Sequence, residues 1–229
     1  MQGRPGAVDP EVLDPERRLA LIYAPAKFRP ALAALWSLDA TLGRIVAARN
    51  QPIVTQMKLA WWREALSVLD SRRVPAEPVL QAFARDALPQ GVGIAAASGL
   101  AGGWEILAVA GQLTPELLSS YAELRGRRLF DLSAQALGGE PAEWIARAGE
   151  GWALIDLGRR STREDEAEAA FAEARARLLR RQKWPARLRS LGMLSILARR
   201  DARRGRTALE SPGAPARQFR MLAHRITGL

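Results

Sequence analysis

Cysteine is absent from the 229 residues, and histidine occurs once, at His224. The lack of cysteine excludes disulfide bonds, thiolate metal sites and a cysteine nucleophile, and it allows a reducing compartment. A single histidine also excludes the histidine-rich metal sites. The sequence therefore contains no cysteine- or histidine-based motif for binding a metal or for redox chemistry.

Long apolar runs are missing as well. No stretch reaches the about eighteen consecutive apolar residues that a membrane-spanning helix requires, and MQGRPGAVDP at the start has no apolar core of signal-peptide length. We expect a cytoplasmic protein, or one at the periphery of the inner face of a membrane. No segment has the composition of a linker, which favours one domain over residues 1–229, with residues 1–13 flexible.

Acidic residues are scarce in the last quarter of the chain. The formal net charge is +10, and from Glu173 onward fifteen Arg and Lys face only three acids. Such a charge suits an anionic partner. The segment has only Trp184 and Phe219 as aromatic residues, and its leucines form a packing face, so we do not expect nucleic acid. We expect a helix whose outer arginines contact anionic phospholipid, namely Arg199, Arg200, Arg203 and Arg204.

Strand signals are absent, whereas helix signals recur along the chain. Asp14 before Pro15 has the pattern of an N-cap followed by proline in the first turn, Ser161 with Glu164 has the pattern of a capping box, and Gly138 is placed as a C-cap. The pattern predicts an all-α fold in a single domain of about ten helices. The predicted helices cover residues 15–24, 31–48, 52–69, 79–87, 94–110, 115–138, 141–160, 164–181, 185–205 and 214–227.

The segment QMKLAWWREAL, residues 56–66, places two adjacent tryptophans between a lysine and an arginine. At helical spacing Trp62 shares a stripe with Leu59 and Leu66, while Trp61 points about 100° away. Both indoles are therefore expected to face protein, with Lys58 and Arg63 at the edges of the buried sector. Tryptophan as core filler beside extended cationic side chains is the plain structural interpretation.

A family resemblance rests on this segment and its neighbours. RRLALIYAPAKFRPALAALWSLD followed by QPIVTQMKLAWWREAL resembles the squalene and phytoene synthase family of head-to-head prenyltransferases. The likeness extends through LTPELLSSYAELRGRRLFDLSAQALGG and weakly through GEGWALIDLGRR, which together cover about three quarters of the chain. It implies an isoprenoid-synthase-type helical bundle. In active members it implies prenyl diphosphates bound through magnesium, which two aspartate-rich motifs on facing helices hold.

The carboxylates of those motifs are not at the matching positions. Gly43 and Ala47 stand where the first pair of acids is expected, and Asp39 lies one turn, about 5.4 Å, too early. In the second motif Asp156 is present, but Arg160 replaces an aspartate. We therefore assign no catalytic and no metal-binding residue. Magnesium is expected only if the enzymatic alternative holds, and acids converging across a hollow would indicate a working synthase.

Three functions follow from these observations. The first is a non-catalytic family-like protein that binds a lipid, an isoprenoid or a protein partner, similar to the branch that contains a mitochondrial complex I assembly factor. The second is an active magnesium-dependent prenyl-diphosphate transferase, and the third is a basic module that binds nucleic acid or a membrane surface. The resemblance and the charges give nine candidate ligand-binding residues: Arg17, Arg29, Lys58, Trp61, Trp62, Arg63, Tyr121, Arg125 and Arg128.

Overall fold

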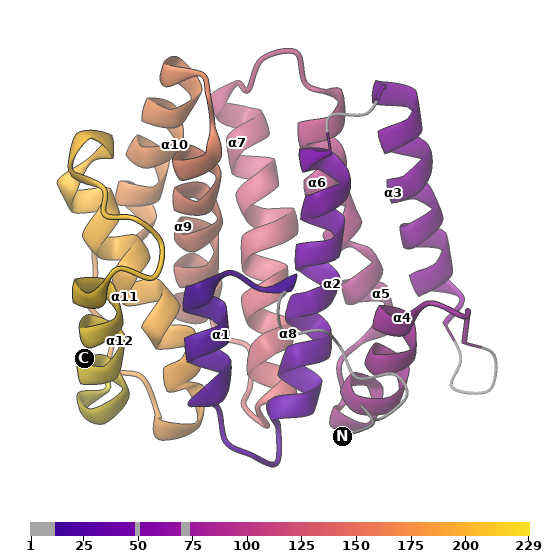
Figure 1. Cartoon of the computed structure of the whole chain (residues 1–229), viewed down its shortest axis with the longest axis horizontal. Helices are drawn as coiled ribbons and strands as arrows, with labels where there is room; N and C mark the ends of the chain where they lie inside the picture. Colours follow the sequence, from indigo (N-terminus) through magenta and orange to yellow (C-terminus); the bar gives the residue numbers. More distant parts are fainter. Residues whose placement is uncertain (1–11, 49–50, 70–73) are drawn as a thin grey trace.

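The computed structural model describes residues 12–48, 51–69 and 74–229, which are helices, turns and bends without a β-strand (Figure 1). The all-α prediction is confirmed. The expectation of a flexible start falls outside the described residues for 1–11, whereas Leu13 is buried and so belongs to the core. None of the described helices is both long and apolar enough to cross a membrane.

The helices follow one another with short connections. Their bounds are α1 (Pro15–Ile22), α2 (Arg29–Ala47), α3 (Pro52–Ser67), α4 (Pro78–Ala82), η2 (Phe83–Ala87), η3 (Leu88–Gln90), α5 (Ile94–Ser98), α6 (Leu100–Val109), α7 (Pro115–Tyr121), η4 (Ala122–Arg127), α8 (Arg128–Ala136), α9 (Glu143–Arg160), α10 (Glu164–Arg177), η5 (Ala186–Leu188), α11 (Arg189–Arg204), η6 (Arg206–Ala208) and α12 (Pro215–Thr227).

Local capping explains several of these boundaries. Oδ1 of Asp14 accepts hydrogen bonds from the backbone N–H groups of Glu16 and Arg17 at 3.0 and 2.9 Å, as the N-cap prediction requires. Gly138 follows α8 with φ +69°, a left-handed conformation that suits glycine. The predicted capping box at Ser161 is wrong, because its hydroxyl accepts from the N–H of Arg163, two residues on.

The predicted helix over 115–138 forms as one continuous segment, but its middle is wider than an α-helix. Residues Ala122–Arg127 form the π-helical segment η4 between α7 and α8. A π-helical turn shifts the side chains on either side of it relative to the regular helical register. In this protein the shifted segment contains Arg125, which is buried.

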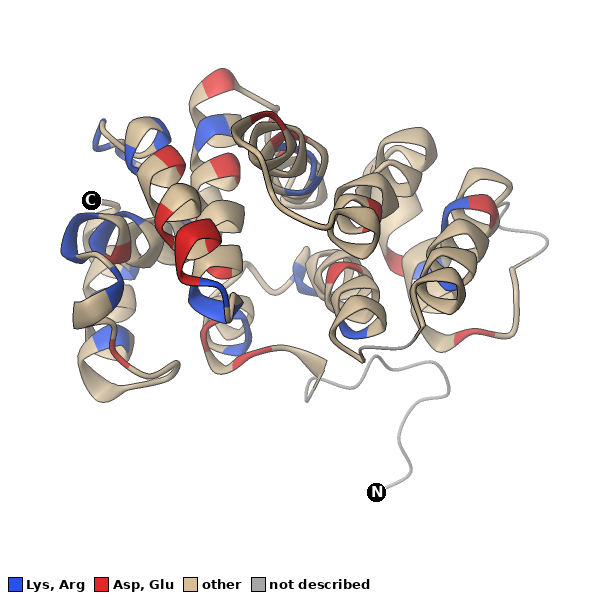
Figure 2. Ribbon diagram, turned by 90° about the horizontal axis from the view of Figure 1, so that it is seen from above, with Lys and Arg blue, Asp and Glu red and all other residues tan. Residues whose placement is uncertain are grey.

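The continuous segment α7–η4–α8 lies in the middle of the molecule, and α9 lies beside it (Figure 1). Helix α9 packs against η4, α8, α10 and α11. At one edge α3 packs mainly on α5 and α6, and at the other α11 packs on α12. Lys and Arg gather at the α11–α12 end, while the opposite end has fewer charged residues, of both signs (Figure 2). A continuous apolar core joins the two ends.

Candidate functional site

The carboxylate of Asp39 on α2 is fully buried and has donors on both oxygens. Oδ1 accepts from Nε1 of Trp104 at 3.0 Å and from Nε of Arg125 at 2.9 Å. Oδ2 accepts from Nη1 of Arg17 at 2.9 Å and from Nη2 of Arg125 at 3.1 Å. Two guanidinium groups therefore neutralise a single buried acid.

Arg125 also reaches a second acid, on α9. Its Nη1 donates to Oδ2 of Asp156 at 2.8 Å and to the hydroxyl of Tyr121 at 2.5 Å. The other oxygen of Asp156 accepts from Nε of Arg160 at 2.9 Å. The guanidinium of Arg125 thus lies between the carboxylates of α2 and α9. We call Arg17, Asp39, Arg125, Asp156 and Arg160 the central cluster.

Aromatic rings enclose the guanidinium of Arg125. Its Cζ lies 4.1 Å from the ring centroid of Trp104, 4.9 Å from that of Trp152 and 5.7 Å from that of Tyr121. The Cζ of Arg17 lies 4.8 Å from the ring of Trp152. Each ring offers a negative face to a cation, and the rings exclude water from the ion pairs.

Close helix packing puts Arg125 at this position. A Cβ on Gly126 would collide with the backbone of Gly149, and a Cβ on Gly149 would collide with the carbonyl of Gly126, so η4 and α9 cross at their backbones. On the other side a Cβ on Gly103 would come within 2.8 Å of the Cβ of Arg125. Gly103 therefore allows α6 to pack closely against η4.

Charge and burial shift the pKa values of this site in opposite directions. Burial raises the pKa of Asp39, but Arg125 and Arg17 outweigh burial and hold that pKa below its usual value. The pKa of Asp156 is likewise lowered, because Arg125, Arg160 and Arg17 outweigh its desolvation. Burial raises the pKa of Tyr121 to about 12. Near neutral pH both acids are therefore ionised, and the tyrosine keeps its proton.

A hollow of about 270 Å³ opens over the cluster, and its lining includes Arg17, Arg125, Gly43 and Ala47. Gly43 and Ala47 are the two positions where the family resemblance places its first acids. At Gly43 the indole of Trp104 takes the space of a side chain, since a Cβ would lie 2.8 Å from its Cη2. An aspartate could not enter this position unless the indole moved.

The central cluster does not fit a magnesium ion. Mg²⁺ takes oxygen ligands in a near-ideal octahedron and requires carboxylate lone pairs directed at the metal. The four carboxylate oxygens of Asp39 and Asp156 each accept at least one hydrogen bond from a guanidinium or indole N–H. Arg125 occupies the space between the two acids, where a bridging metal would have to lie.

Three of the nine candidate residues meet in this site: Arg17, Tyr121 and Arg125. The others lie elsewhere on the molecule. Arg29 is exposed at the start of α2, about 21 Å along the helix axis from Gly43 at 1.5 Å per residue. The side chain of Arg128 packs against Gly99. Lys58, Trp61, Trp62 and Arg63 lie on α3 at the edge of the fold.

The tryptophan pair behaves only in part as predicted. Trp62 is buried, whereas Trp61 is 47% exposed, so the expectation that both indoles face protein is wrong for Trp61. The rings meet edge to face at 5.4 Å. Trp61 continues an exposed apolar stripe on the outer side of α3 that includes Met57 and Val68, because the described helices pack on only one side of α3.

The sequence does not indicate two parts of the site. Trp104 and Trp152 line the guanidinium, but nothing in their local pattern distinguishes them from core tryptophans. Asp39 and Asp156 attract attention in the sequence only as displaced metal ligands, whereas the structure pairs both with arginine. Among the residues that the structure describes, no three or more His, Asp or Glu side chains are grouped as metal ligands would be.

The expected arginine-rich outer face of α11 is also different in the structure. Arg200 and Arg204 both bind the carboxylate of Glu210, and the side chain of Arg200 is only 10% exposed. Arg199 donates to the backbone carbonyl of Leu179 at 3.2 Å. The four arginines therefore do not form one free cationic face, because an acid on the following loop neutralises two of them.

Comparison of the chain with protein-family models, with curated proteins and with solved structures finds no match.

Proposed function

We propose that this protein is a non-catalytic member of the squalene and phytoene synthase type, which acts by binding a lipid, an isoprenoid or a protein partner in the cytoplasm or at the inner face of a membrane. The observation that carries the proposal is the position of Arg125 between Asp39 and Asp156. In this arrangement the guanidinium of Arg125 supplies the positive charge that magnesium supplies in active members of the family.

The energetics favour a structural role for the cluster. Moving several charges out of water is unfavourable, and a buried ion pair compensates only when every donor and acceptor is engaged. Here the fork of Arg125, the indole of Trp104 and the guanidinium of Arg17 engage both oxygens of Asp39. A site that releases diphosphate needs carboxylates that are free to bind a metal ion. In this protein the carboxylates of Asp39 and Asp156 bind arginine instead.

The alternative of a magnesium-dependent transferase gives a direct test. The full-length protein would be incubated with farnesyl or geranylgeranyl diphosphate and Mg²⁺, and diphosphate release would be measured. We expect no metal-dependent release above a reaction without protein. Turnover that requires both protein and Mg²⁺ would overturn the proposal, and loss of that turnover in Asp39→Asn would assign it to the central cluster.

The partner class needs a second measurement, because the central cluster does not name it. The exposed apolar stripe on α3, with Met57, Trp61 and Val68, offers a surface for a protein or lipid partner. We expect Trp61→Ser to weaken partner capture without loss of fold. Equal capture by the wild-type protein and Trp61→Ser would remove α3 from the binding surface.

A further inference from the structure

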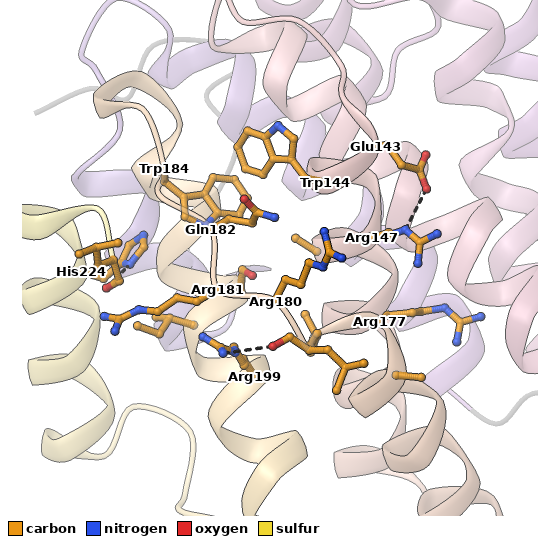
Figure 3. Close-up of a pocket in the computed structure, with 17 residues that line it drawn as sticks. Glu143, Trp144, Arg147, Arg177, Arg180, Arg181, Gln182, Trp184, Arg199 and His224 are labelled. Atoms are coloured by element: carbon orange, nitrogen blue, oxygen red, sulfur yellow. Dashed lines mark hydrogen bonds and ion pairs between the residues drawn. The ribbon is translucent and has the colours of Figure 1, made fainter.

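A second hollow, of about 610 Å³, lies where α9, the end of α10, α11 and α12 meet (Figure 3). Its volume lies within the usual range of small-molecule sites. It shares no residue with the central cluster. Five arginines and a single acid, Glu143, line it; the arginines are Arg147, Arg177, Arg180, Arg181 and Arg199.

Two of the five arginines have carboxylate partners. Nε of Arg147 lies 3.1 Å from Oε1 of Glu143, and Nε of Arg177 lies 3.2 Å from Oε2 of Glu150. Glu143 is itself shared with Arg127, whose Nη1 lies 2.9 Å from its other oxygen. The one acid of the lining is therefore already neutralised.

The other three arginines have no carboxylate partner in the part of the chain that the structure describes. Among the described residues neither Arg180 nor Arg181 has a hydrogen-bond or ion-pair partner, and Arg199 donates only to the carbonyl of Leu179. Burial, together with the charges of Arg203 and Arg181, lowers the pKa of Arg199. All three line the hollow, and Figure 3 shows Arg181 extending towards His224 and Arg180 extending towards Arg147. Positive charge gathers here without a counter-ion from the protein.

A serine hydroxyl and a glutamine amide also lie at this hollow. Ser195 on α11 lines the hollow and is 8% exposed, and its hydroxyl has no partner among the described residues. Gln182 at the rim also lacks a protein partner there. Both side chains can therefore form hydrogen bonds with a ligand in the hollow.

The rest of the wall is apolar. Trp144 and Trp184 meet edge to face with centroids 4.8 Å apart, and Leu178 and Ile196 extend this surface. Leu179 also lines the hollow and is 68% exposed. The hollow thus combines an apolar wall with a cationic rim.

His224 also lines the hollow, but its ring carries no charge that could bind an anion. Its Nδ1 lies 2.9 Å from the carbonyl of Leu229, and burial lowers its pKa, so the ring is neutral at pH 7. Its Nε2 faces the backbone of Gly192, where a Cβ would collide with it. The anion must therefore be held by the arginines at the rim.

We propose that this hollow binds a phosphate-bearing amphiphile, with the phosphate held by Arg180, Arg181 and Arg199 and the apolar body against Trp144 and Trp184. Guanidinium groups recognise phosphate through charge-assisted hydrogen bonds, and Ser195 and Gln182 add neutral partners. The same phosphate chemistry can come from a molecule free in solution or from the headgroup of an anionic phospholipid. The inference goes beyond the proposal for the central cluster and stands without it.

The test compares two variants with equal charge loss. In R180Q/R181Q the two free arginines of the rim are neutralised, whereas K27Q/R220Q neutralises two exposed cations outside the hollow. A third variant, Ser195→Leu, fills the hollow with no change in charge. Circular dichroism and thermal melting would first establish that each full-length variant is folded.

Binding would be measured by calorimetry with inorganic pyrophosphate and monomeric dihexanoyl phosphatidic acid, and by flotation with phosphatidylcholine vesicles with and without phosphatidic acid. We expect R180Q/R181Q and Ser195→Leu to bind at least about tenfold more weakly than wild type, and K27Q/R220Q to bind nearly as wild type. Binding of the monomeric lipid identifies a ligand taken from solution, and binding to vesicles alone identifies a headgroup.

Two results would overturn the proposal. One is equal weakening in R180Q/R181Q and K27Q/R220Q, since a loss that depends only on net charge would not need the hollow. The other is that folded wild-type protein binds none of the phosphate probes. Neither result bears on transferase activity, so failure here is distinguishable from failure of the central-cluster proposal.

Discussion

Arg125 binds Asp39 through a two-pronged fork, with Nε 2.9 Å from Oδ1 and Nη2 3.1 Å from Oδ2, although 86 positions separate the two residues. Such bidentate geometry requires both helices to keep one register, because a shift of either breaks both bonds. The pair therefore fixes η4 against α2, and its third contact, to Asp156, fixes both against α9.

Removal of that guanidinium is the most direct test of its role. Arg125→Ala is expected to lower the free energy of unfolding by about 3–5 kcal/mol, because Asp39 and Asp156 lose a shared buried partner. Arg125→Lys should cost less, since it keeps the charge but not the fork. Urea denaturation measures both.

The matched control for Arg125 is Arg63. Its Nη1 lies 2.9 Å from Glu105 at a partly exposed site, so Arg63→Ala should change stability by less than about 1 kcal/mol. If Arg125→Ala were no more destabilising than Arg63→Ala, the buried cluster would not organise the fold.

The close contact of Gly126 with Gly149 predicts that one added methyl group lowers the stability of the protein. Gly126→Ala would push a Cβ into the backbone of Gly149, and we expect a loss of about 1–3 kcal/mol, from overpacking that backbone atoms cannot relieve. Gly111→Ala is the control, because a Cβ there meets nothing within 4 Å. Equal melting temperatures for the two variants would contradict the close crossing.

The partly buried carboxyl group of Asp131 on α8 should make the stability of the folded protein depend on pH. Burial raises the pKa of Asp131 to about 6, and its Oδ1 has no hydrogen-bond partner among the described residues. The nearby Arg127 binds Glu143 and Glu150. A pKa raised in the folded state makes the folded protein bind the proton more tightly than the unfolded chain. Stability contributed by this group is therefore present below about pH 4 and is lost as the pH rises to about 6.

The substitution Asp131→Asn removes the decrease in stability that ionisation of Asp131 causes at higher pH. We expect the variant to be more stable than wild type by about 1 kcal/mol at pH 8, a value reduced for the partial exposure of the group, and the difference to vanish near pH 4. Thermal melting of both proteins across this pH range gives the comparison. A constant difference at every pH would show that ionisation of Asp131 is not its cause.

The two adjacent tryptophans should respond very differently to truncation. Trp62→Ala opens a cavity in the core and should cost about 3–5 kcal/mol. Trp61→Ser removes a side chain that is 47% exposed and should change stability by less than about 1 kcal/mol. Denaturation of each variant checks this, and a comparable loss in both would mean that Trp61 is covered in solution.

Helix positions could be read from the sequence because their signals are local. The N-cap at Asp14 and the left-handed Gly138 act within a few residues of themselves, and both form as predicted. The capping box at Ser161 fails because its short side chain bonds a nearer N–H. The all-α fold thus follows from short-range chemistry repeated along the chain.

The site was only partly predictable, because its members come from several helices. Arg17, Tyr121 and Arg125 were among the candidates, yet their pairing with Asp39 depends on how α1, α2 and η4 cross. Trp61 differs from Trp62 for a related reason: helical periodicity predicts two apolar directions on α3, but only tertiary packing decides which one is covered.

For this protein the amino-acid order alone determined the helical class, the sites where helices begin and the concentration of basic charge near the C-terminus. Only the tertiary structure decided that Arg125 lies between two acids and that Glu210 neutralises Arg200 and Arg204. It also decided that Arg180 and Arg181 lie at a hollow without a partner among the described residues. The physical reason is range: capping and periodicity act over a few residues, whereas the partner of a charge depends on which distant segment packs beside it.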